Sequence, residues 1–182
     1  MALSAFTKAC SRHTPGIKEI WLGIATGFTS GVIGTNIVTL VSNAQVLWSL
    51  PQDSMKITQT PTGSKNGLFY VEKTIEIQWN KIENASLIPL RDLADSSACG
   101  ITVMYQTNNN EWFCSGFEKA SDTALSADRG LFFETGEMTS GMELTEDDSD
   151  IAKVTLKGTF PEFDFSMNTV AHTVGAAGLT AD

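Results

Sequence analysis

Hydrophobic and polar residues alternate most clearly between residues 67 and 117. From Phe69 every second residue is apolar as far as Trp79, with Lys73 as the only interruption. An alternation of period two is typical of a strand with one buried face. Two further alternating runs, 101–105 and 112–117, flank residues 107–110, whose asparagines tolerate the positive φ of tight turns. This region therefore predicts one strand and, later in the chain, a β-hairpin.

Between these strands the pattern changes to that of a helix. Apolar residues recur at steps of three or four: Leu87, Leu90, Leu93 and Ala94. Asn84 can cap the helix, and we expect Pro89 in the first turn, where its missing N–H matters least. The pattern predicts one α-helix after the strand.

The other segments predict more strands. Residues 17–25 are apolar on both faces, which indicates a strand covered on both sides. Residues 46–50, 55–60, 131–134 and 151–158 also read as strands, and we expect 55–60 to pair antiparallel with the strand from Phe69. Residues 119–129 are expected to form a surface connection and 137–149 a loop. The fold class is mainly β: a β-sandwich or distorted barrel with one flanking α-helix, an extended loop and terminal arms.

Residues 26–43 contain no charged side chain, although they are rich in glycine, threonine and serine. One interpretation is a hairpin that becomes buried only when copies assemble; the other is two core strands joined by glycines. The first makes the apolar residues of this segment candidates for an oligomer interface: Val32, Ile33, Ile37, Val38, Leu40 and Val41. We expect a single domain over 1–182, with arms at 1–15 and 168–182.

Charge is unevenly distributed along the 182 residues, whose formal net charge is −9. Residues 1–91 hold 8 basic and 5 acidic residues, a net +3, whereas 92–182 hold 4 basic and 16 acidic, a net −12. An acidic surface does not grip nucleic acid, but it lets DNA pass without sticking. Opposite charge in the two halves favours head-to-tail contact between copies; the alternative is a soluble acidic domain with an uneven surface.

The sequence offers no catalytic constellation. Cys10, Cys99 and Cys114 lack metal-ligand spacing, and we expect reduced thiols, leaving open whether Cys99 and Cys114 are neighbours. His13 and His172 lie in the expected arms as solvated residues. The acidic residues of 143–150 lack the alternation of a calcium loop. We therefore predict no enzyme activity, no cofactor and no metal.

The remaining patterns point the same way. The tryptophans Trp21, Trp48, Trp79 and Trp112 lie in expected strands without interleaved basic residues, which favours core packing over base stacking. Residues 1–12 lack the pattern of a signal peptide, and no apolar run is long enough to span a bilayer.

Several motifs resemble those of structural proteins of tailed bacteriophages and prophages. They are LRDLADSSACGITV at 90–103 with WFCSGF at 112–117, ACSR at 9–12 with GIKEIWL at 16–22, and GMELT at 141–145 with AKVTLKG at 152–158. The resemblance implies a tail-tube-like subunit: a β-sandwich with a flanking helix, forming stacked rings around a DNA-conducting channel.

In that family role, residues 26–43 would be the inter-subunit hairpin, and the two arms would bridge rings. The resemblance further implies a hexameric homo-oligomer that contacts other virion proteins, assembles in the bacterial cytoplasm and does not bind a membrane. A head–tail connector or a capsid-decorating protein is the alternative within the same class. The alternative of another class is a ligand- or carbohydrate-binding β-sandwich, with Trp48 or Trp112 lining a groove.

Overall fold

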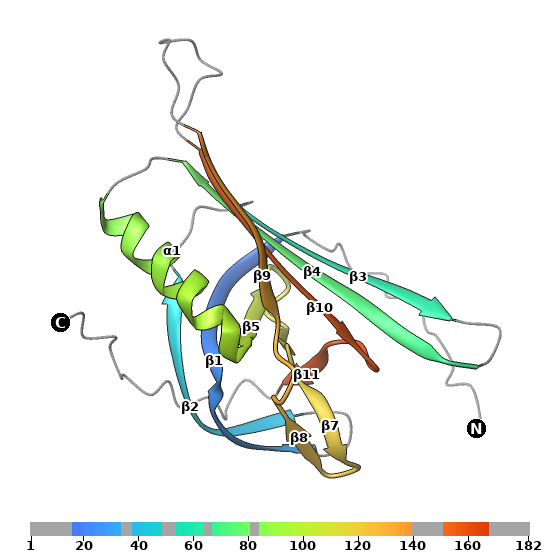
Figure 1. The fold of residues 1–182 in the computed structure, drawn as a ribbon. Coiled ribbons are helices and arrows are strands. Elements are labelled where there is room, and N and C mark those ends of the chain that lie inside the picture. Colours follow the sequence, from blue (N-terminus) through green and yellow to red (C-terminus); the bar gives the residue numbers. More distant parts are fainter. Residues whose placement is uncertain are drawn as a thin grey trace.

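The computed structural model describes residues 16–33, 38–48, 54–63, 67–80, 84–139 and 151–167 (Figure 1). The elements are β1 (Ile17–Ile33), β2 (Val38–Trp48), β3 (Met55–Gly63), β4 (Phe69–Asn80), α1 (Asn84–Ser96), the 3-10 helix η1 (Ser97–Cys99), β5 (Ile101–Thr107), β6 (Trp112–Ser115), β7 (Glu118–Ser121), β8 (Ala124–Ser126), β9 (Phe132–Thr139), β10 (Ile151–Phe160) and β11 (Phe165–Met167). The predicted class, mainly β with one α-helix, is confirmed.

One sheet has four strands in the order β3-β4-β10-β9, and every neighbouring pair is antiparallel. The expected pairing of β3 with β4 is confirmed, with Ile57 opposite Ile75 and Gly63 opposite Phe69. β4 and β10 pair over their full common length, from Asn80–Ile151 to Val71–Phe160. We call this the four-stranded sheet.

The other sheet has seven strands in the order β2-β11-β6-β5-β1-β8-β7. β2 also pairs antiparallel with β1, so the strands β1, β2, β11, β6 and β5 return on themselves. The closing contact between β2 and β11 is a single parallel pair, Val38 with Met167. The seven-stranded sheet is therefore partly rolled into a small barrel, and β8 and β7 extend from the far half of β1.

Two clusters of buried side chains lie on opposite faces of the seven-stranded sheet. The first cluster fills the space between the two sheets; it contains Ile20, Leu22, Val103 and Tyr105 from one sheet and Ile75, Ile77, Val154, Leu156 and Phe160 from the other. The second cluster contains Ala25, Met104, Trp112, Cys114, Phe117, Leu125, Ala127 and Met167. Adjacent residues such as Met104 and Tyr105 belong to different clusters because strand side chains alternate between faces. The molecule is thus a sandwich in which one layer curls around a second core.

β1 explains the mixed periodicity of residues 17–25. The register with β5 shifts between Ile17 and Glu19, so Ile17 joins Ile20 in the first cluster, whereas strict alternation would place it on the face of Trp21. Trp21 packs against the second cluster. A β-bulge thus changes the face on which later residues lie, and the strand is covered on both sides, as predicted.

The helix α1 lies along one side of the two sheets, with Leu93 buried and Leu90 half-buried against the first cluster (Figure 1). It begins at Asn84, so Pro89 lies in the second turn and not in the first. Proline there leaves the carbonyl four residues earlier without its helical N–H partner.

Several boundaries differ from the sequence prediction. Residues 119–129 are not a plain connection, because β7 and β8 lie there and Leu125 is buried opposite Gly31 of β1. β9 runs to Thr139 instead of ending at Glu134, since its pairing with β10 continues to Ile151. β11 was not predicted, because three residues carry too little pattern.

Candidate functional site

The predicted interface segment forms the hairpin of β1 and β2. Val32 is 51% exposed and Ile33 is half-buried near the second cluster. The backbone of Val38, Leu40 and Val41 lies in β2, while their side chains, and Ile37 altogether, lie outside the described part of the chain. The hairpin is present, and Val32 reaches its surface; whether other copies cover it stays a prediction.

The four-stranded sheet has two edge strands within the described residues: β3 pairs only with β4, and β9 pairs only with β10. The start of the β9 edge is partly occupied, because Phe133 N–H donates to Ser97 Oγ at 2.6 Å and the preceding Leu131 pairs with Ile101 of β5. Unpaired edges expose backbone N–H and C=O groups that can pair with another strand. Four antiparallel strands also make β3 and β9 run in opposite directions.

The backbone orientation of β3 follows from one hydrogen bond. Gln78 N–H donates to the carbonyl of Ser54 at 2.7 Å, immediately before β3. Backbone groups of successive strand residues point to opposite sides, so those of Met55, Ile57 and Gln59 face away from β4. Pro61 occupies the same outward series, where its missing N–H breaks no bond to β4.

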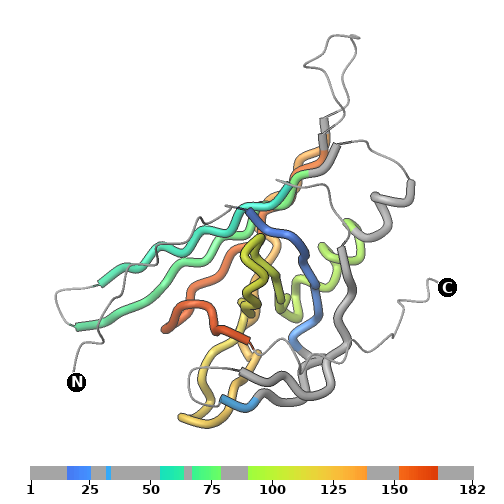
Figure 2. Tube along the Cα trace, turned by 180° about the vertical axis from the view of Figure 1, so that it is seen from behind, coloured from blue at the N-terminus to red at the C-terminus, as the bar shows by residue number. Residues whose placement is uncertain are grey.

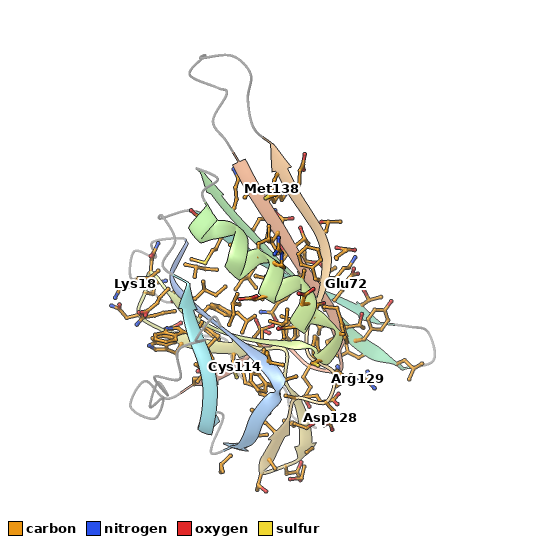
Figure 3. The ribbon with its side chains drawn as sticks, turned by 60° about the vertical axis from the view of Figure 1, so that its left-hand side comes forward. Lys18, Glu72, Cys114, Asp128, Arg129 and Met138 are labelled. Atoms are coloured by element: carbon orange, nitrogen blue, oxygen red, sulfur yellow. The ribbon has the colours of Figure 1, made fainter. Side chains whose placement is uncertain are left out.

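The outer face of the four-stranded sheet is polar, rich in hydroxyls and has paired charges. Threonines recur over its strands: Thr58, Thr60, Thr62, Thr74, Thr135, Thr155 and Thr159. Lys153 contacts Glu76 at 3.9 Å, and Lys157 lies between Glu72 and Glu134 (Glu72 is labelled in Figure 3). The hydrogen bond from Lys157 to Glu72, followed by the charge of Glu134, raises the pKa of Lys157. Two of the lysines on this face are thus paired with carboxylates, while Lys56 on β3 is exposed.

An apolar group of four residues lies where the β3–β4 hairpin extends beyond the end of β10 (Figure 2). It consists of Leu68, Phe69, Tyr70 and Phe163, whose exposed fractions range from 41% to 68%; Phe69 and Tyr70 are consecutive in β4 and so lie on opposite faces of the hairpin. The rings of Phe69 and Phe163 lie 6.0 Å apart between centroids. We call this group the hairpin tip. Large neighbouring apolar side chains on a surface indicate a contact site.

A charged pair lies inside the molecule, on the inner side of the same sheet. Lys73 Nζ is 2.8 Å from Asp164 Oδ1, and the two side chains are 0% and 1% exposed. Tyr105 O–H donates to Asp164 Oδ2 at 2.8 Å, and the Gln59 amide donates to the same oxygen at 2.9 Å. The Phe160 ring lies 4.6 Å from Nζ. We call Lys73, Asp164, Tyr105 and Gln59 the buried polar cluster.

The cluster connects four segments. Gln59 and Lys73 come from β3 and β4 of the four-stranded sheet, and Tyr105 comes from β5 of the seven-stranded sheet. Asp164 lies in the passage from β10 to β11, where the chain leaves one sheet for the other. The cluster therefore links the two layers at this crossing.

Burial perturbs two acids near the cluster. Burial, followed by the charge of Asp164, raises the pKa of the Tyr105 phenol far above its ordinary range. Cys114 is labelled in Figure 3. Burial, followed by the charge of Asp164, also raises the pKa of its thiol. Both groups therefore stay protonated at neutral pH, and neither provides a nucleophile.

The sequence carried one signal for this cluster. Lys73 interrupts the alternation of β4 at a position that faces the core, and a charge there needs a partner. Its partner comes 91 residues later in the chain, with no local pattern, so the pair could not be assigned from the sequence.

The other candidate residues do not lie together in the structure, or they lie outside the described residues. Cys99 is exposed, Cys114 is buried, and both are free thiols. Trp112 is 6% exposed in the second cluster, so it cannot line a surface groove in this chain. His13, His172, the acidic residues of 143–150 and Trp48's side chain lie outside the described part.

Within the described ranges, no group of three or more His, Cys, Asp or Glu side chains could hold a metal ion. None of the described helices is long and apolar enough to cross a membrane. Comparison of the chain with protein-family models, curated protein sequences and solved structures finds no match.

Proposed function

We propose that the chain is a structural subunit of a phage virion, a tail-tube-like protein that forms stacked rings around a DNA-conducting channel. The observation that carries the proposal is the pair of edge strands of the four-stranded sheet: β3, and β9 beyond the residue that Ser97 contacts. In a ring built by rotation, β3 of one copy meets β9 of the next, and the two strands run antiparallel. Sheet extension of this kind satisfies the outward backbone groups of β3.

The stagger of the two edges supports closure into a ring. The pairings across the sheet allow the midpoints of both edge strands to be compared on β10. The midpoint of β3 lies level with a residue of β10 that is about four positions further along than the residue level with the midpoint of β9. Full-length pairing of these edges would then shift the register by about one residue per strand. A register shift of one residue per strand means that the total shift around a closed barrel, its shear number, equals its number of strands. Strands of such barrels are tilted by about 36° from the barrel axis.

The size of such a barrel fits the proposed channel. A hexamer, the ring that the resemblance implies, contributes about 24 strands, which at a spacing of about 4.8 Å and this tilt enclose a bore roughly 45 Å across. Side chains that point inward narrow this bore, and the remaining space still admits a DNA duplex. The threonines and neutralised lysines of the outer face would line it without gripping phosphates.

Imaging of the purified full-length protein tests the proposal most directly. Negative-stain micrographs should contain rings or stacked tubes, and sedimentation should show an assembly that grows with protein concentration. A monodisperse monomer at high concentration overturns the proposal. Rings located at the portal or on the capsid surface of particles would instead assign a connector or decorating role.

Paired cysteines test the edge contact itself. Thr58 on β3 and Glu137 on β9 are exposed on the outer face, and full-length pairing of the edges places them near each other. In a background with Cys10 and Cys99 replaced by serine, the double variant Thr58→Cys/Glu137→Cys should give a ladder of disulfide-linked multimers on oxidation. Each single variant should give dimers at most, and a double variant that behaves like the singles contradicts β3–β9 pairing.

A further inference from the structure

The two oxygens of the buried Asp164 carboxylate have different surroundings. Oδ1 contacts Lys73 Nζ at 2.8 Å, and apart from this contact neither atom has a hydrogen-bond partner among the described residues. Oδ2 accepts from both Tyr105 O–H and the Gln59 amide. One oxygen thus faces an amine, while the other is held by two donors.

The donors are fixed in place. The backbone N–H of Asp164 donates to Gln59 Oε1 at 2.9 Å, which orients the Gln59 amide with its N–H₂ group toward Oδ2. Burial raises the pKa of Tyr105, so its phenol keeps its proton as a donor. Two fixed donors on one oxygen can stabilise negative charge that develops there.

We propose that Lys73 and Asp164 form an intramolecular amide bond between Nζ and Cγ. A proton passes from the ammonium to Oδ1, which converts the ion pair into an amine and a carboxylic acid. Nζ then attacks Cγ, and negative charge develops on Oδ2 against Tyr105 and Gln59. A second proton passes from nitrogen to Oδ1, the Cγ–Oδ1 bond breaks, and one water molecule leaves. No oxidant, reductant or other reactant is consumed.

The surroundings favour each step. Two unit charges in a dry interior are destabilised by lost hydration, which lowers the free-energy difference between the ionic and neutral pairs. The fold holds amine and acid in contact, so the reaction has the high effective concentration of an intramolecular step. The Phe160 ring beside Nζ contributes to a site from which water is excluded, which disfavours hydrolysis of the product.

The bond would join the two layers of the sandwich covalently. Lys73 lies in the middle of β4, and Asp164 immediately precedes β11, so residues 73–164 would become a closed loop. A cross-link over such a long loop strongly restricts the unfolded chain. The inference rests on the buried polar cluster alone and does not depend on the proposed function.

Mass spectrometry of the denatured full-length protein tests the bond. The intact mass should fall below the sequence mass by one water molecule, and tryptic digestion should give a branched peptide joining the segment around Lys73 to the segment around Asp164. Trypsin should also fail to cleave after Lys73. A full sequence mass with separate linear peptides overturns the proposal and leaves an ordinary ion pair.

Variants separate the roles of the residues. Lys73→Met and Asp164→Ala should each show the full sequence mass, and Asp164→Asn should lose ammonia and give the same branched peptide. Tyr105→Phe removes one donor from Oδ2 and should slow bond formation roughly a hundredfold, as followed by intact mass at successive times after synthesis of the chain. Equal rates in Tyr105→Phe and the unmodified sequence contradict the assigned role of Oδ2. The main measurement uses the unmodified sequence, so it does not depend on whether any variant folds.

Discussion

Lys73 is a charged side chain in a row of apolar ones, and its energetics depend on a single partner. Until the proposed amide bond forms, its ammonium has no solvent contact and relies on the Asp164 carboxylate for electrostatic compensation. Removal of one member of a buried ion pair is strongly destabilising, whereas replacement of both members by apolar side chains is much less so.

This gives a prediction for the pair. Relative to the ion-paired chain, Asp164→Ala should lower the free energy of unfolding by about 3–5 kcal/mol, because it leaves a buried charge without its counter-ion. Loss of the proposed amide bond would add to this cost. Adding Lys73→Met to Asp164→Ala should recover part of the loss, as measured by urea denaturation. A double variant less stable than Asp164→Ala would show that volume, and not charge, dominates at this site.

The raised pKa values of Tyr105 and Cys114 predict a loss of stability at alkaline pH. In the unfolded chain the thiol and phenol release their protons near the ordinary pKa values of 9.0 and 10.0, whereas in the folded protein they retain them. The unfolded state therefore binds fewer protons above these values, and stability falls by up to roughly 1.4 kcal/mol per pH unit for each group.

Denaturation midpoints measured from pH 7 to pH 11 check this prediction. Below pH 8, ionisation of these two groups should not change the stability of the unmodified chain. Above pH 9, its stability should fall. Cys114→Ala should flatten the curve from pH 9, and Tyr105→Phe should flatten it from pH 10. Unchanged slopes in both variants would contradict the assignment.

At the scale of elements, the strong patterns located the structure well and the weak ones did not. The alternation of β4 located that strand and its buried face, because it follows one regular period. The three-to-four spacing located α1, but of its predicted apolar face Leu93 is buried, Leu90 is half-buried and Ala94 is exposed. β1 was harder, since its bulge changes the phase of the alternation between Ile17 and Glu19. β11 exists only through its pairing with β6 and β2, which the sequence of three residues cannot encode.

The helix supplies a prediction at this scale. Leu93 is the buried apolar residue of α1 among the described residues, so Leu93→Ala should lower the free energy of unfolding by about 2–4 kcal/mol. Asp95 lies exposed in the same helix, and Asp95→Ala should change stability by less than about 0.5 kcal/mol. Equal effects in urea denaturation would mean that packing of α1 against the first cluster contributes little.

At the scale of the whole molecule, exposed apolar side chains lie at opposite ends of the four-stranded sheet. The hairpin tip extends beyond one end of β10, and Met138 lies on β9 near the other end (Figure 3). Copies stacked end to end would bring such regions together, which gives the hairpin tip a place in the proposed assembly.

The corresponding prediction concerns assembly and not folding. Leu68→Ser with Phe69→Ser should raise the protein concentration needed for assembly by roughly ten- to a hundredfold, because two apolar contacts are lost. Ile24→Ser, at another exposed apolar residue, is the matched control and should leave that concentration unchanged. Sedimentation measures assembly, and circular dichroism checks that both variants stay folded. A hairpin-tip variant that assembles like the control would exclude this surface as a contact.

The passage through Asp164 into β11 has a consequence for how the protein is made. A ribosome delivers β1 and β4 long before it delivers residues 164–167, yet β11 closes the small barrel and Asp164 neutralises Lys73. A nascent chain that lacks these residues holds an unclosed layer and an unneutralised lysine. Its final shape therefore has to wait for the end of this stretch of translation, and until then the unclosed layer exposes strand edges to other chains.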